Sequence, residues 1–129
     1  MRANTVDSRR PLIELNGIYR HFASGSQSVA VLKDISLSIG RGEMVAIIGA
    51  SGSGKSTLMN IIGCLDKPTH GEMSIHDIAT RQASSEQLAQ LRSQYSGFIF
   101  QRYHLMPYLT ATENVVIPAL YTAMPSTER

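Results

Sequence analysis

Nine consecutive residues, 49–57, have the types and the spacing of a phosphate-binding loop. They read GASGSGKST and match the pattern GxxxxGK[ST] at every fixed position. Glycines let successive backbone N–H groups turn inward and form a concave nest for an anion, because no Cβ obstructs the turn. The string therefore predicts a site for the phosphates of a nucleotide. The residues concerned are Gly49, Ala50, Ser51, Gly52, Ser53, Gly54, Lys55, Ser56 and Thr57.

Two side chains at the end of this loop add a charge and a metal ligand. Lys55 brings a full positive charge to the place expected for the β- and γ-phosphates, and the Ser56 hydroxyl is placed to ligate Mg²⁺. A helix that begins at about Lys55 would aim its unpaired N–H groups and the positive end of its dipole at the same oxygens. These residue types predict binding of a nucleoside triphosphate with Mg²⁺.

The segments on either side of the loop must position it. Residues 44–48 are an unbroken apolar run, typical of a strand that is buried on both faces. After the loop, Leu58, Ile61 and Leu65 recur at helical spacing, which predicts a helix that buries one stripe and is ended by residues 66–68. Strand, glycine loop and helix thus follow one another in the order that a phosphate loop requires.

The other apolar patterns predict an α/β protein with two kinds of sheet. Further strands are expected at about residues 12–15, 29–32, 35–39, 73–75 and 97–100. The early strands would form an antiparallel β layer, and a partial parallel α/β core would start at Met44. Residues 1–11 are expected to be a flexible polar tail.

Two capping boxes predict where the later helices begin. Ser84 with Gln87 opens one helix, and Thr110 with Glu113 opens another. In such a box the two side chains satisfy two backbone N–H groups that the start of a helix otherwise leaves unpaired. Pro118 lies inside the second of these helices and is expected to kink it.

Composition narrows the class of protein. The 129 residues make one domain at most, and a net charge of +2 is too small for nucleic-acid binding through bulk electrostatics. No run approaches the roughly 18 apolar residues of a membrane span, and the polar first ten residues lack the apolar core of a signal peptide. Any membrane association is therefore expected through a partner. Cys64, the only cysteine, reads as a core or boundary residue.

Gln101 is a second candidate site residue. It follows the apolar run 97–100, so its amide falls at the carboxyl end of an expected strand, where open α/β sheets place ligand groups. There it could approach Mg²⁺ or the attacking water. A phosphate loop by itself does not choose among kinases, GTPases, motor ATPases and transporter ATPases. A small-molecule kinase stays open as an alternative, although no Arg-rich lid follows residue 60.

From about residue 12 to residue 120 the sequence resembles the nucleotide-binding domain of ATP-binding cassette (ABC) transporters. The resemblance rests on Gly42 and Glu43, on the loop at 49–57, and on residues 98–101, which look like the family's Q-loop. It implies a P-loop NTPase fold of the ABC ATPase type that binds ATP and Mg²⁺. It also implies that Gln101 contacts Mg²⁺ and the γ-phosphate region and couples the nucleotide state to a permease.

The same resemblance implies further contacts. Phe22 occupies the place where the family usually has a tyrosine that stacks on adenine, and stacking needs only a π face; a plain core residue is the alternative. Residues 59–66 and 101–107 look most like the macrolide-exporting and lipoprotein-releasing branches. In these systems two ATP-binding domains drive a membrane permease that works with periplasmic and outer-membrane partners. The chain would then lie at the cytoplasmic face of the bacterial inner membrane, with residues 103–109 near the permease.

After Gln101 the chain departs from the family pattern. No LSGGQ-type signature, no second apolar strand ending in Asp-Glu and no switch histidine follows, so residues 12–129 are expected to be the N-terminal half of the domain. By the resemblance, the missing Asp supports Mg²⁺ and the missing Glu polarises the attacking water. Loss of a general base costs about 10² to 10⁴ in rate, so we expect ATP binding without hydrolysis. A non-catalytic fragment that associates with a permease or an intact subunit is the other alternative.

Overall fold

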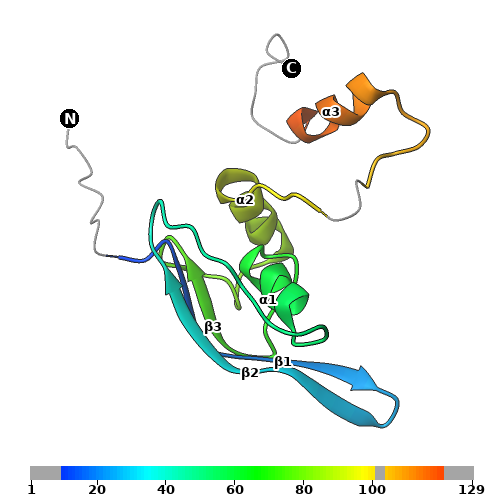
Figure 1. The fold of residues 1–129 in the computed structure, drawn as a ribbon. Helices are drawn as coiled ribbons and strands as arrows, with labels where there is room; N and C mark the ends of the chain where they lie inside the picture. The colour runs from blue at the N-terminus through cyan, green and yellow to red at the C-terminus, as the bar shows by residue number, and fades with distance from the viewer. Residues whose placement is uncertain (1–9, 101–103, 121–129) are drawn as a thin grey trace, which may run out of the picture.

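The structure is a computed structural model that describes residues 10–100 and 104–120. Along the chain the elements are β1 (Ile13–Ser24), β2 (Gln27–Ile39), α1 (Lys55–Ile62), β3 (His70–Ile75), β4 (Ile78–Ala79), α2 (Ser85–Tyr95) and α3 (Ala111–Leu120). Within these residues, no helix is long and apolar enough to cross a membrane. Figure 1 shows α3 set apart from the sheet, beyond α2.

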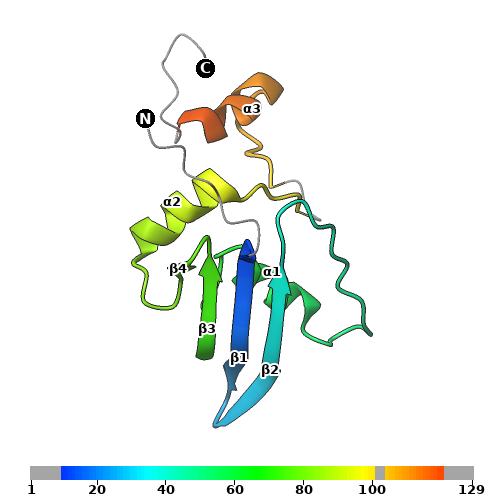
Figure 2. The ribbon, with the colours of Figure 1, turned by 90° about the vertical axis from the view of Figure 1, so that its left-hand side faces the viewer.

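The strands form one antiparallel sheet in the order β2-β1-β3-β4 (Figure 2). In its register, Leu15 lies opposite Leu37 of β2 and opposite Met73 of β3. The predicted antiparallel layer is therefore present. The two strands expected at 29–32 and 35–39 are one continuous strand, because shifts in register against β1 absorb the irregularity between them.

Helices α1 and α2 lie on one face of this sheet and close the core against it (Figure 1). Four side chains are almost completely buried there, with at most 1% of their surface exposed: Leu15, Ile18, Ile61 and Met73. Burial of a side chain of this size contributes about 1.5 to 3 kcal/mol. These four side chains thus join the first helix to β1 and β3, and they fix the position of the loop that precedes that helix.

The beginnings of the helices agree with their sequence signals. Helix α1 begins at Lys55, as predicted, but it ends at Ile62 and not at 66–68, because Cys64 takes a left-handed backbone conformation with φ of 56°. In the box before α2, Gln87 N–H donates to Ser84 Oγ at 3.2 Å, and Ser84 N–H donates to Gln87 Oε1 at 2.8 Å.

The box before α3 is equally complete. Glu113 N–H donates to Thr110 Oγ1 at 3.2 Å, and Thr110 N–H donates to Glu113 Oε2 at 2.7 Å. Both capping-box predictions are therefore confirmed. Helix α3 includes Pro118 within its bounds.

The two strands predicted for a parallel core are not formed in the described part of the chain. Residues 44–48 and 97–100 carry no strand, and Met44, Ile48 and Ile99 are 98%, 90% and 104% exposed. The prediction of buried strands here was wrong because a strand needs a hydrogen-bonded neighbour, and the antiparallel sheet supplies none to either segment. Most of their apolar side chains therefore stay exposed, although Ile47 packs against the core.

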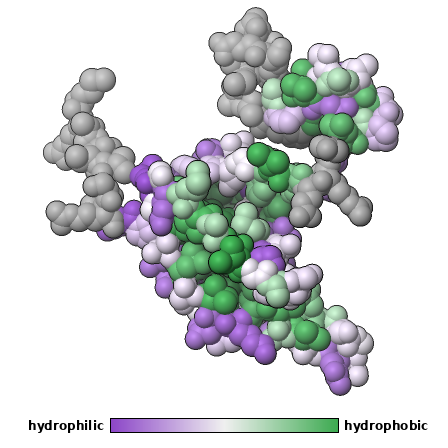
Figure 3. All heavy atoms as spheres, viewed as in Figure 1, coloured by the Kyte–Doolittle hydropathy of each residue, from purple (hydrophilic) through white to green (hydrophobic). Residues whose placement is uncertain are grey.

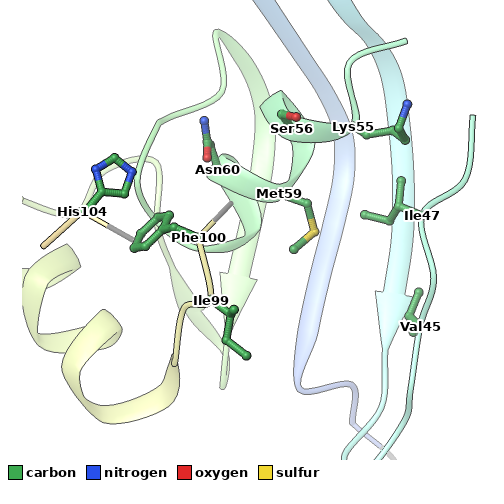
Figure 4. A pocket seen from close by; sticks show the side chains of 9 residues that line it. All are labelled: Val45, Ile47, Lys55, Ser56, Met59, Asn60, Ile99, Phe100 and His104. Atoms are coloured by element: carbon green, nitrogen blue, oxygen red, sulfur yellow. The ribbon is translucent and has the colours of Figure 1, made fainter. Parts of the chain in front are cut away.

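A cavity of about 660 Å³ separates these two segments. Figure 4 shows Val45 and Ile47 on one side of it, Ile99 and Phe100 on the other, and Met59 of α1 between them. Figure 3 shows apolar surface gathered on the face that carries α1. We refer to residues 44–48 and 97–100 together as the open segments.

Candidate functional site

The glycine loop leads directly into α1, and its glycines set the geometry of the entry. Gly54 is the N-cap residue, with a left-handed φ of 89° and ψ of 5°, and Gly52 is also left-handed, with φ of 78°. Among the described residues, no side chain caps the helix at this end. The N–H groups of the first turn are therefore left for another acceptor, as an anion-binding helix start requires.

Two glycines also allow close contacts that a side chain would prevent. A Cβ on Gly54 would lie 2.9 Å from Leu32 Cδ2 and 3.1 Å from the Val31 carbonyl oxygen. A Cβ on Gly49 would lie 2.8 Å from Ser53 Oγ. The loop therefore packs tightly on β2 while its own turn stays narrow, which fits a cradle of backbone N–H groups around phosphate oxygens.

The Lys55 ammonium group folds back over this loop. Its Nζ donates to the carbonyl oxygens of Gly49 and Ala50 at 2.8 and 2.6 Å, and it lies 3.4 Å from Ser53 Oγ. Three acceptors thus hold one positive charge at the mouth of the loop. Because these acceptors are neutral, a phosphate anion would be a stronger partner for the same charge.

Beside the loop is a shallow hollow of about 190 Å³, lined by Val31 and by residues 52–57. Ser56 is exposed, and it borders both this hollow and the larger cavity beside the open segments. Its hydroxyl is an oxygen ligand of the type that Mg²⁺ accepts, together with water and phosphate oxygens. The donor set therefore fits a magnesium nucleotide.

Phe22 lies near the end of β1, on the same face of the sheet as the loop. It is 40% exposed and pairs across the hairpin with Val29. Val29 comes two residues before Val31, whose side chain lies close to Gly54 of the loop. Directly opposite side chains in an antiparallel pair lie on the same face. The alternative of a core position for Phe22 does not agree with this exposure. Gln101, the remaining predicted site residue, lies outside the described residues.

The sequence reasoning missed Arg20, which lies beside Phe22, and Asp66, which pairs with Arg20. Arg20 places its guanidinium carbon 4.4 Å from the centroid of the Phe22 ring, and its Nε lies 2.9 Å from Asp66 Oδ2. The available signal was strand alternation, since Arg20 is two residues before Phe22 and so shares its face.

Cys64 is buried, as predicted for a core residue, and lies just beyond α1. Burial raises the pKa of its thiol, and the nearby charge of Arg92 partly opposes that rise. The Arg92 Nη1 group donates to the Cys64 carbonyl oxygen at 2.6 Å, which joins α2 to the end of α1. The buried Cys64 side chain therefore serves packing.

A family model described as ABC transporter matches residues 32–129. The chain belongs to the ABC transporter family. The glycine loop, α1 and the open segments all lie within the matched region. At the level of the family, the chain is related to the ATP-binding domains of transport ATPases.

Curated relatives include macrolide exporters. The macrolide export ATP-binding/permease protein MacB of Shewanella sp. (strain ANA-3) is 57% identical over 120 residues, which cover 93% of this chain and 18% of that protein. MacB 1 of Aeromonas hydrophila subsp. hydrophila is 55% identical over 116 residues, which cover 90% of this chain and 18% of that protein. The chain therefore spans less than a fifth of the length of these relatives.

Solved structures confirm the fold class. The ATP-binding cassette MJ0796, as a post-hydrolysis dimer bound to ADP and Pi, matches with a TM-score of 0.82 and 43% identity over 90% of this chain and 51% of its own. The protein cbiO1 from Clostridium perfringens, part of the ABC transporter complex cbiONQ, matches with a TM-score of 0.71 and 26% identity over 92% of this chain and 46% of its own. The fold is that of about half of an ABC ATPase cassette.

Proposed function

We propose that this chain binds Mg²⁺-ATP as the nucleotide-holding part of an exporter ATPase of the macrolide-export type. The observation that carries the proposal is the loop at 49–57, which leaves the start of α1 uncapped and turns the Lys55 ammonium back over itself. The loop occurs in a chain that is 57% identical to MacB of Shewanella sp.. This similarity supports ATP as the nucleotide and export as the process that the nucleotide drives.

Each predicted site residue then has a role toward the nucleotide. The N–H groups of residues 49–57 surround the phosphates, and Lys55 exchanges its carbonyl acceptors for the β- and γ-phosphate oxygens. Ser56 and Gln101 hold Mg²⁺, which neutralises phosphate charge when it is bound. Phe22 stacks on adenine. A hydrogen bond to a charged group contributes about 1.5 to 3 kcal/mol, so Lys55 contributes most among the side chains.

The 129 residues are proposed to bind ATP without hydrolysing it. Of the described residues that line the hollow at the loop or the larger cavity beside it, none is a carboxylate that could act as a general base. The same cavity lies between the open segments, neither of which pairs with a described strand. Binding and turnover are therefore separable properties of this chain.

The proposed partners are a membrane permease and a second ATP-binding domain, with periplasmic and outer-membrane partners reached through the permease. The segment proposed to face the permease includes Leu105, Met106 and Tyr108, which are 65%, 41% and 77% exposed. An exposed apolar group of this kind is typical of a surface that a partner covers. The chain is thus proposed to lie at the cytoplasmic face of the bacterial inner membrane.

Equilibrium dialysis with Mg²⁺-ATP, followed by a phosphate-release assay on the same sample, tests this function. Saturable binding of one nucleotide per chain is expected, with phosphate release at the rate of the buffer alone. Absence of binding at millimolar nucleotide would contradict the proposed site. Release above background that persists after repeated purification would contradict the proposed separation of binding from turnover.

A further inference from the structure

Arg20 connects the expected adenine-binding ring to the segment that follows the phosphate-loop helix. Its Nε is buried and lies 2.9 Å from Asp66 Oδ2 as an ion pair without hydrogen-bond geometry, and the two side chains are only 24% and 29% exposed. The guanidinium carbon lies 4.4 Å from the centroid of the Phe22 ring. One side chain therefore makes an ion pair and a cation–π contact at the same time.

The strand register places this contact on the face that carries the loop. Arg20 lies opposite Leu32 in the hairpin, and Phe22 lies opposite Val29. The Leu32 side chain is one of the groups that Gly54 approaches, at 2.9 Å from where a Cβ would be. Arg20 and Phe22 alternate onto one face of β1, and the pairing of Arg20 with Leu32 places that face on the side of the entry to α1.

We propose that Arg20 is a positioning residue for the nucleobase. The inference rests on the proposed function, because it concerns the base of the nucleotide that the loop holds. Arg20 covers one face of the Phe22 ring, and Phe22 is still 40% exposed, which leaves ring surface for a purine. Asp66 fixes the guanidinium group in this place, since its carboxylate is anchored just beyond α1, where Asp66 Oδ1 also accepts from the Lys67 N–H at 2.8 Å.

Two physical effects support this role. A phenylalanine ring has no polar atom that could fix its own orientation, so a charged group held against one face restricts the ring before a ligand arrives. The cation also attracts the electron density of the ring, which favours stacking of an electron-rich purine on the opposite face. Removal of the charge should therefore weaken the part of the affinity that comes from the base and leave the phosphate part unchanged.

The test compares two probes by titration calorimetry on the 129-residue chain: Mg²⁺-ATP, and Mg²⁺ with inorganic tripolyphosphate, which has no base. Arg20→Met keeps the apolar stem and removes the charge. We expect ATP to bind this variant about three- to tenfold more weakly, with tripolyphosphate affinity within about twofold of the original. Arg81→Met removes the same charge from an exposed position and should change neither affinity.

Two more variants keep the test decisive if Arg20→Met does not fold. Asp66→Asn removes the anchor and should lower ATP affinity in the same selective way, by a smaller factor. Arg20→Lys keeps the charge and should bind ATP more tightly than Arg20→Met. Equal weakening of both probes, or an unchanged ratio of ATP to tripolyphosphate affinity in folded Arg20→Met and Asp66→Asn, would overturn the inference. Failure of the unaltered chain to bind either probe would instead overturn the proposed function.

Discussion

The β1–β2 hairpin and the open segments are both rich in apolar residues, yet the hairpin buries several of them and the open segments leave most of theirs exposed. In the hairpin and its helix, Leu15, Ile18 and Ile61 are at most 1% exposed, whereas Ile48 and Ile99 in the open segments are 90% and 104% exposed. The difference is one of partners: β1 pairs with β2 and β3, and neither open segment pairs with any described strand. An apolar run thus becomes a buried strand only where its neighbours are present.

This comparison also explains why the loop forms although the strand expected before it does not. The loop is held by the elements that follow and flank it. Gly54 packs closely on Val31 and Leu32 of β2, and Ile61 of α1 is buried in the core. Phosphate-binding geometry therefore depends on the β1–β4 sheet with α1 and α2. Hydrolysis is proposed to need further groups that cover the open segments.

The largest contrast is expected between core and open-segment truncations. Ile18→Ala should cost about 2 to 5 kcal/mol of unfolding free energy, because it removes a completely buried side chain. Ile99→Ala should change it by no more than about 0.5 kcal/mol, because the side chain contacts solvent. Urea unfolding of the unaltered chain and both variants measures the two effects. A cost for Ile99→Ala close to that of Ile18→Ala would mean that the segment is paired in solution.

The β1–β4 sheet with α1 and α2 should by itself give a modest melting temperature. We expect the isolated chain to unfold in a weak thermal transition below about 60 °C, the upper part of the range for mesophilic domains. The physical reason is the uncovered apolar surface of the open segments and α1, which gives the folded state little gain there. Calorimetry measures the transition. A sharp two-state melt above that temperature would contradict the contrast between the two regions.

A smaller contrast is expected between two glycines. Gly54→Ala places a Cβ 2.9 Å from Leu32 Cδ2 on a backbone with φ of 89°, which should cost about 1 to 3 kcal/mol. Gly97→Ala, in an open segment, meets no atom within 4 Å and should be neutral or slightly stabilising. Thermal unfolding of the two variants compares them. Equal destabilisation by both would contradict the tight packing of the loop on β2.

The smallest effect concerns the two capping boxes. Two hydrogen bonds from Thr110 to the Glu113 carboxylate lower the pKa of Glu113 in the folded state. The larger effect comes from the backbone N–H and the smaller from the hydroxyl group. The stabilisation is therefore present above the ordinary carboxyl pKa and is lost as pH falls through the lower, folded value. Helix α3 should lose amide protection on acidification through this range. The capping box of α2 uses the neutral Gln87, so acidification should cause no such loss in α2 through that box.

Glu113→Gln is the control for this titration. It should make the protection of α3 independent of pH over the same range, because a glutamine amide does not ionise there. Hydrogen exchange followed by NMR on both chains measures the protection. An unchanged acid response of α3 in Glu113→Gln would assign the titration to another group.

Local signals predicted the parts of the site that local interactions determine. The glycine pattern, the Ser84 and Thr110 capping boxes and the start of α1 depend on contacts within a few residues, so the sequence alone indicates them. The strand predictions at 44–48 and 97–100 failed because pairing is not local. The contact of Arg20 with Asp66 joins residues 46 apart in the sequence (66 − 20) and depends on how the end of α1 meets β1, which no pattern contains.

The most direct test of the central claim is the stabilisation of the chain by Mg²⁺-ATP, with and without Lys55. At a ligand concentration 100 times its dissociation constant, binding to the folded state should add about 2.7 kcal/mol to the unfolding free energy. The Lys55→Ala variant should lose this gain at the same ATP concentration, and Lys33→Ala, at an exposed position on β2, should keep it. An equal gain in Lys55→Ala would contradict the assignment of the phosphate site to the loop at 49–57.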